Sequence, residues 1–236
     1  MKFVPTLAAM AALTALSTAA TSAADGSGIA LAIVYDTSGS MSESVRASAG
    51  GSSPKYIIAN RALIAVARQI QTFSTNSAAG APRKIETALF TFRGDQAQEI
   101  IKLGPFDESA LEDWAKKFSQ PAGGTPLGRA LEAASKTVLK SPLPRKHVLI
   151  ITDGMNTLGP SPDGVLPNLQ HQADAAHSTL SVHFIAFDVA ARTFNGVKKL
   201  GATVVSASDE KQLNTQLDFI LQRKILLEDE EPAKKN

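Results

Sequence analysis

The sequence predicts an α/β fold: a doubly wound, mostly parallel sheet with helices on both faces. One observation is that continuous apolar runs alternate along the chain with segments whose apolar residues have helical spacing. This alternation is typical of parallel strands joined by helical crossovers. A second observation is a pair of short strand patterns around the turn Arg93-Gly94-Asp95, which predicts one antiparallel edge strand.

The first half of the chain supplies the clearest elements. Residues 29–35, IALAIVY, form a continuous apolar run, the pattern of a strand buried on both faces. Residues 56–73 have helical spacing, and residues 84–92 and 97–103 are predicted strands. Residues 107–118 open with acidic residues and end with lysines, an order that the helix dipole favours.

The second half continues the alternation. Pro126 fits the first turn of a helix, and Asp209 is suited to cap another. The expected elements are, in order, a helix beginning near Thr125, a buried strand at 146–152, a turn-rich segment at 155–167, a helix at 168–180, a strand at 181–189, a short helix at 194–200, a short strand at 202–207 and a last helix through Leu226.

The chain is expected to divide into a signal peptide at 1–24, one domain at 25–227 and a charged flexible tail at 228–236. Residues 4–20 are uncharged and dominated by Ala and Leu, and Ser22 and Ala24 suit the small-residue positions before a cleavage point. A retained membrane anchor is the alternative, although the run is marginal for a bilayer. The tail, EDEEPAKKN, carries too little apolar surface to pack.

Composition narrows the possible partners and the compartment. The net charge of +2 is scattered, so neither nucleic acid nor an anionic membrane is an expected partner. The absence of cysteine excludes disulfides and a lipid-modified cysteine anchor. No second apolar run reaches bilayer length, so we expect no membrane span in the mature chain and a periplasmic or secreted location.

Five oxygen-bearing side chains are expected to meet at one edge of the sheet. Asp36, Ser38 and Ser40 follow the first strand, where alternation places them on one side of the chain. Thr125 precedes a helix, and Asp153 ends a strand with its side chain expected at the rim. Such edges bind ligands in doubly wound sheets, and an all-oxygen set suits a hard divalent cation.

At these residues the sequence resembles the von Willebrand factor type A domains. The segments DTSGSM, GGTPL and TDG match the metal-ion-dependent adhesion site of that family, Asp-x-Ser-x-Ser followed by a threonine and an aspartate. The matching residues are Asp36, Ser38, Ser40, Thr125 and Asp153. The resemblance spans residues 29–226 and implies a six-stranded sheet. It also implies a Mg²⁺ or Mn²⁺ ion, with Ca²⁺ as a further candidate, whose open position takes an Asp or Glu carboxylate from a protein partner.

Two segments beside the expected site have no clear role. Residues 42–55 are long for the family pattern and rich in Ser and Gly, which predicts a mobile loop able to shape partner choice. The turn-rich residues 155–167 are expected to flank the site on its other side.

The combined prediction is a divalent-metal-dependent protein-binding module of the cell envelope, for adhesion or complex assembly, and not an enzyme. The alternatives are a metal-assisted hydrolase on the same site and an accessory subunit of an envelope complex. Against the hydrolase, the sequence places no further His, Glu or Lys at the rim as a general base. His147 and His183 fall within predicted strands and are expected in the core.

Overall fold

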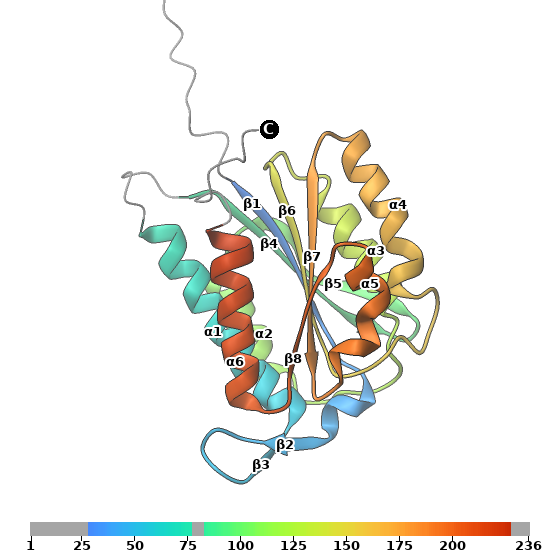
Figure 1. The fold of residues 1–236 in the computed structure, drawn as a ribbon. Coiled ribbons are helices and arrows are strands. Elements are labelled where there is room, and N and C mark those ends of the chain that lie inside the picture. Colours follow the sequence, from blue (N-terminus) through green and yellow to red (C-terminus); the bar gives the residue numbers. More distant parts are fainter. Residues whose placement is uncertain (1–27, 77–82, 228–236) are drawn as a thin grey trace, which may run out of the picture.

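A six-stranded sheet forms the centre of the computed structural model, which describes residues 28–76 and 83–227. Its strand order is β5-β4-β1-β6-β7-β8 (Figure 1). The pair β4–β5 is antiparallel and the other four adjacent pairs are parallel, which confirms the predicted fold class. The strands are β1 (Ile29–Tyr35), β4 (Ile85–Arg93), β5 (Gln96–Pro105), β6 (Arg145–Thr152), β7 (Thr179–Phe187) and β8 (Thr203–Ala207).

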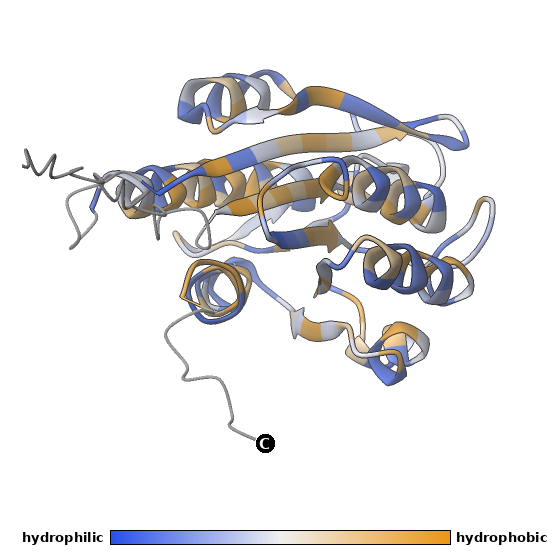
Figure 2. Ribbon diagram, turned by 90° about the horizontal axis from the view of Figure 1, so that it is seen from above, coloured by the Kyte–Doolittle hydropathy of each residue, from blue (hydrophilic) through white to orange (hydrophobic). Residues whose placement is uncertain are grey.

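Helices cover both faces of the sheet. One face carries α1 (Lys55–Thr75), α2 (Glu108–Lys117) and α6 (Glu210–Ile220), and a π-helix (Leu221–Leu226) continues α6. The other face carries α3 (Leu127–Val138), α4 (Pro162–Ala175) and α5 (Asn195–Lys199), the last preceded by a 3₁₀ helix (Ala191–Phe194). Figure 2 shows these amphipathic helices flanking the strands on either side.

The central strand divides its side chains between two cores. All seven residues of β1 are buried. Side chains alternate along a strand, so Ile33 and Tyr35 pack with α1 and α6 while Ala32 and Val34 pack with α3. This double burial explains why the run in the sequence is continuously apolar.

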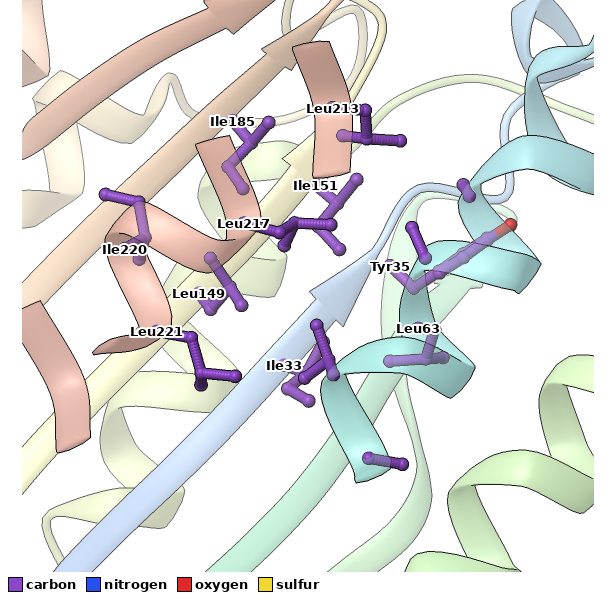
Figure 3. Packing of buried hydrophobic residues seen from close by; sticks show 14 of the residues in the cluster. Ile33, Tyr35, Leu63, Leu149, Ile151, Ile185, Leu213, Leu217, Ile220 and Leu221 are labelled. Atoms are coloured by element: carbon purple, nitrogen blue, oxygen red, sulfur yellow. The ribbon is translucent and has the colours of Figure 1, made fainter. Parts of the chain in front are cut away.

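The first core is built mainly where α6 and α1 cross the strands. Leu213 and Leu217 of α6 lie against Ile151 and Ile185 (Figure 3). Tyr35 points its hydroxyl towards α1, where it donates to the Asn60 side chain at 2.7 Å. This bond satisfies the polar end of an otherwise apolar, fully buried side chain.

The helix α4 begins and ends earlier than predicted. Residues 162–167, expected in a turn-rich segment, are helical, because Ser161 caps the helix by accepting from Gly164 N–H and Pro162 occupies the first helical position. The predicted helix at 168–180 stops at Ala175. His177 has a φ of +49°, which turns the chain towards β7.

Residues 42–55, predicted to form a mobile loop, contain a short hairpin. The hairpin follows a 3₁₀ helix (Gly39–Ser42) and consists of the antiparallel strands β2 (Ser44–Arg46) and β3 (Ser52–Pro54). The backbone N–H of Ser48 donates to Glu210 Oε2 at 2.7 Å, which ties the hairpin to the start of α6. Figure 1 shows the hairpin at the end of the sheet where the parallel strands finish.

The predicted signal peptide, residues 1–24, and the predicted tail, residues 228–236, lie outside the described residues. Within the described ranges, no helix combines the length and the apolar character needed to cross a bilayer.

Candidate functional site

The site lies where β1 and β6 end side by side. In the sheet, β4 lies on one side of β1, and β6 and β7 lie on its other side. The carboxyl ends of β1 and β6 therefore flank a topological switch point. The backbone N–H of Asp36 donates to the carbonyl of Ile151 at 3.0 Å and holds the two strand ends in register. Ligand sites of doubly wound sheets occur at such points.

Asp36 is a fully buried carboxylate with partners on both oxygens. Its Oδ1 accepts from the backbone N–H of Ser38 at 2.8 Å, and its Oδ2 accepts from Thr152 Oγ1 at 2.5 Å. Burial raises the pKa of Asp36 to about 6, although these hydrogen bonds lower it, and the charge of Asp153 adds to the rise. A cation at the site would favour the ionised form.

Two serine hydroxyls connect this strand end to the next. Ser38 Oγ lies 3.1 Å from Ser40 Oγ, and Ser40 Oγ donates to Asp153 Oδ1 at 2.8 Å. Ser38 and Ser40 therefore lie together, but a 3₁₀ helix at Gly39–Ser42 brings them there and not the predicted alternation of an extended chain. This turn directs the Ser40 hydroxyl at the aspartate that follows β6.

Thr125 lies near these serines on the loop before α3, which is hydrogen-bonded to the segment after β1. Gly39 N–H donates to the Gly123 carbonyl at 3.0 Å, and Gly123 has a φ of +85°, a conformation that favours glycine. Thr125 is buried, and its backbone N–H donates to Thr157 Oγ1 at 2.8 Å.

Gly154 shows how closely the hydroxyls approach one another. A Cβ atom at this position would lie 3.7 Å from Thr125 Oγ1 and 3.8 Å from Ser40 Oγ. The two hydroxyls are therefore close to one point beside Asp153, as the sequence analysis expected.

Asp153 follows β6 at the rim of the sheet, but its side chain is buried. Its side chain has 0% exposure, and its Oδ2 accepts from Lys55 Nζ at 3.0 Å. The same ammonium lies 2.8 Å from Glu43 Oε2 and 3.1 Å from Asp188 Oδ2. Burial alone would lower the pKa of Lys55, but the hydrogen bonds of the three carboxylates outweigh it and the pKa is raised.

Lys55 is the residue of the site that sequence reasoning missed. No lysine was predicted at the rim, yet Lys55 is the first residue of α1 and its ammonium contacts the Asp153 carboxylate. A polar residue at the start of an apolar helix was the available signal, but helix starts are commonly polar, so it did not point to a site.

The donor set has the chemistry of a hard-cation site. It combines the carboxylates of Asp36 and Asp153 with the hydroxyls of Ser38, Ser40 and Thr125. Among residues 28–76 and 83–227, no group of three His, Cys, Asp or Glu side chains is arranged to hold a metal, so any ion here would depend on the hydroxyls. The arrangement fits an ion that keeps open or water-filled positions.

An exposed apolar border flanks these residues. Met155 is 64% exposed and Leu158 36% exposed, and both lie in the loop after β6. Leu158 packs over Gly124, where its Cδ1 would lie 2.7 Å from an added Cβ. The glycine therefore gives Leu158 the room to sit next to Thr125.

Comparison with known proteins agrees with this geometry. The sequence model of the von Willebrand factor type A domain family matches residues 31–156, which include all five candidate residues. No curated protein sequence matches the chain.

Solved structures with similar folds come from several sources. The PilB minor pilin from Streptococcus sanguinis has 16% identity and a TM-score of 0.61, with 84% of this chain and 61% of PilB covered. The vWF domain of the type V pili tip protein Mfa5 from Porphyromonas gingivalis has 14% identity and a TM-score of 0.60, covering 89% of this chain and 99% of that domain. A von Willebrand factor type A protein from Catenulispora acidiphila has 18% identity and a TM-score of 0.55, covering 81% of this chain and 41% of that protein.

Identities this low establish a shared fold, whereas the sequence match covers more than half of the chain and includes the switch-point loops. The chain belongs to the von Willebrand factor type A domain family.

Proposed function

We propose that this protein is a binding module that captures a protein partner through a divalent cation. Asp36, Ser38, Ser40, Thr125 and Asp153 would hold the ion, with Mg²⁺ or Mn²⁺ as the first candidates and Ca²⁺ as a further one. The observation that carries the proposal is the hydrogen-bonded series from Ser38 through Ser40 to Asp153, with the Thr125 hydroxyl beside it.

The charges of the site favour an external carboxylate as the ligand. Three of the five donors are neutral hydroxyls, and the charge of Asp153 is shared with Lys55. A divalent ion held this way keeps part of its positive charge, and when bound it would supply a Lewis-acidic point for an Asp or Glu from the partner. The exposed Met155 and Leu158 add apolar surface beside that point.

A location in the cell envelope is part of the proposal. It rests on the predicted signal peptide at 1–24 and on the likeness to PilB, described as a minor pilin, and to Mfa5, described as a pili tip protein. For this chain both the location and the adhesive or assembly role are inferences from the sequence and the fold.

Binding is preferred to the hydrolase alternative because of how the candidate bases are held. Lys55 is surrounded by three carboxylates and stays protonated. His147 lies near the amino end of β6 and His183 in the middle of β7, so this buried pair is several residues from the carboxyl ends that form the site. Neither group is placed to take a proton from a water molecule at the site.

Thermal unfolding with Mg²⁺ and with EDTA tests the cation, because a ligand that binds only the folded state raises the melting temperature. We expect Mg²⁺ to raise it in the wild type and in Thr179→Ala, an exposed threonine at the other end of β7, but not in Thr125→Ala. Equal melting temperatures of the wild type in Mg²⁺ and EDTA would count against the proposal.

Affinity capture tests the partner. A protein retained in Mg²⁺ should be lost in EDTA and lost with Ser40→Ala, and replacing one of its own Asp or Glu residues by the amide should weaken binding to the level seen in EDTA. Retention that ignores both EDTA and Ser40→Ala would contradict the cation-mediated mechanism.

A further inference from the structure

The Lys55 ammonium is placed between the candidate site and two outer carboxylates. On its inner side is Asp153, whose other oxygen accepts from Ser40. On its outer side are Glu43, before the hairpin, and Asp188, after β7. The side chain of Lys55 is 3% exposed, whereas those of Glu43 and Asp188 are 69% and 40% exposed.

Asp153 thereby has one oxygen facing the hydroxyl series and one facing a fixed positive charge. Repulsion between like charges is strong where water is excluded, so a cation beside Asp153 is disfavoured by the neighbouring ammonium. The same ammonium also orients the carboxylate, so its net effect on cation affinity depends on which of the two actions dominates.

We propose that Lys55 sets the cation affinity of the site by offsetting the charge of Asp153, so that the site holds a free ion weakly and retains more of the ion's charge for the partner's carboxylate. This inference rests on the proposed function. It makes Lys55 an affinity-determining residue rather than a ligand, because an ammonium has no lone pair to donate.

Two features favour charge over simple orientation. Ser40 already fixes the inner oxygen of Asp153 at 2.8 Å, so the carboxylate keeps one partner without Lys55. The ammonium is shared among three carboxylates, which is more than orienting one of them requires.

The outer carboxylates, Glu43 and Asp188, are expected to affect cation affinity in the opposite direction from Lys55. Removing the negative charge of Glu43 or Asp188 leaves the ammonium less compensated, so its repulsion of a cation grows. The effect should be smaller than that of Lys55 itself, because these side chains are partly exposed and water screens them.

Titration of Mn²⁺ into the metal-free chain, followed by the paramagnetic resonance signal of free Mn²⁺, tests this inference. Lys55→Met, which keeps the apolar stem, should bind Mn²⁺ at least about tenfold more tightly than the wild type. Glu43→Gln and Asp188→Asn should each bind it about two- to fivefold more weakly. The exposed Lys198→Met is the matched control and should not differ.

The outcomes separate this inference from the function on which it rests. A wild type that does not bind Mn²⁺ overturns the proposed function and this inference with it. A wild type that binds Mn²⁺, with Lys55→Met binding equally or more weakly, overturns the inference alone and makes Lys55 an orienting clamp. If circular dichroism shows that Lys55→Met does not fold, the two outer variants decide, and unchanged affinity in both overturns the inference.

Discussion

The carboxyl ends and the interior of the central strands both bury polar side chains, but with different results. At the carboxyl ends, Asp36 and Asp153 belong to a network that includes hydroxyls and an ammonium. Further back along β6 and β7, His147 and His183 stack with ring centroids 5.6 Å apart, and His147 Nδ1 lies 3.3 Å from His183 Nε2. The first group offers several oxygens to one point, whereas the second is a pair of buried rings.

Burial disfavours charge in both regions. It raises the pKa of Asp36 to about 6, and it lowers the pKa of His147 to about 3 and that of His183 to about 4. A cation can relieve this cost only at the carboxyl end, where oxygens converge. Burial of an ionisable group is therefore not enough to identify a functional site, and the arrangement of its partners must be considered as well.

The largest expected effect is on cation binding at the carboxyl end. Asp36→Asn keeps the shape of the side chain but removes one of the two negative charges, so we expect Mn²⁺ affinity to fall by about a hundredfold or more. Asp113→Asn, at an exposed position on α2, is the matched control and should leave affinity unchanged. If Asp36→Asn binds Mn²⁺ like the wild type, the oxygens of this end do not form a cation site.

Asp153→Ala should affect both cation binding and stability. It removes the buried partner of Lys55 and leaves that ammonium with its outer partners, Glu43 and Asp188. Because the ammonium keeps two of its three partners, we expect the free energy of unfolding in urea to fall by about 1 to 2 kcal/mol. A loss below about 0.5 kcal/mol would indicate that the pair is solvated in solution.

The histidine pair should affect stability rather than binding. Both folded-state pKa values lie below the ordinary value of 6.5, so the unfolded chain takes up protons first as the pH falls. Stability should fall between pH 6.5 and about 4, by up to about 1.4 kcal/mol per pH unit for each histidine. The raised pKa of Asp36 acts in the opposite direction in this range, so the slope must be compared between variants.

Urea unfolding at pH 6.5 and pH 5 makes this comparison. The double variant His147→Leu, His183→Leu should lose much of the pH dependence, whereas the exposed His171→Leu should retain it. An unchanged slope in the double variant would mean that the pair does not remain neutral in the folded state.

Thr152→Val should give the smallest effect. The substitution removes the hydroxyl that donates to Asp36 Oδ2 but preserves the branched shape of a fully buried strand residue. We expect a loss of about 1 kcal/mol in the free energy of unfolding and a modest weakening of Mn²⁺ binding. A gain in stability would show that this hydrogen bond does not hold Asp36 in place.

The sequence predicted the elements with strong periodicity. The alternation of buried runs and helical spacing identified β1, β6 and the helices between the strands. The apolar runs before Asp36 and Asp153 placed these two residues at strand ends, and Thr125 was placed before a helix, α3. These predictions succeed because burial on both faces of a strand leaves a continuous apolar run, and because strand ends on one edge lie close together.

The missed features depend on contacts distant in sequence or on backbone geometry. Lys55 lies 98 residues from Asp153, and nothing in the local pattern of either residue indicates their pairing. The hairpin at 44–54 lacks the apolar alternation of a buried strand, because it is two-stranded and largely exposed. The early start of α4 was hidden by two prolines and a glycine that locally suggest turns.

A crystal of the chain grown with Mn²⁺ tests the central claim most directly, because the anomalous signal of the ion locates it without reference to any activity. The account predicts a peak beside Gly154, within about 2.1 Å of the Ser38 and Ser40 hydroxyl oxygens if the coordination is direct, with a remaining position open to solvent or to a carboxylate. The absence of a peak there at millimolar Mn²⁺, or a peak only at the outer carboxylates of Glu43 and Asp188, would contradict it.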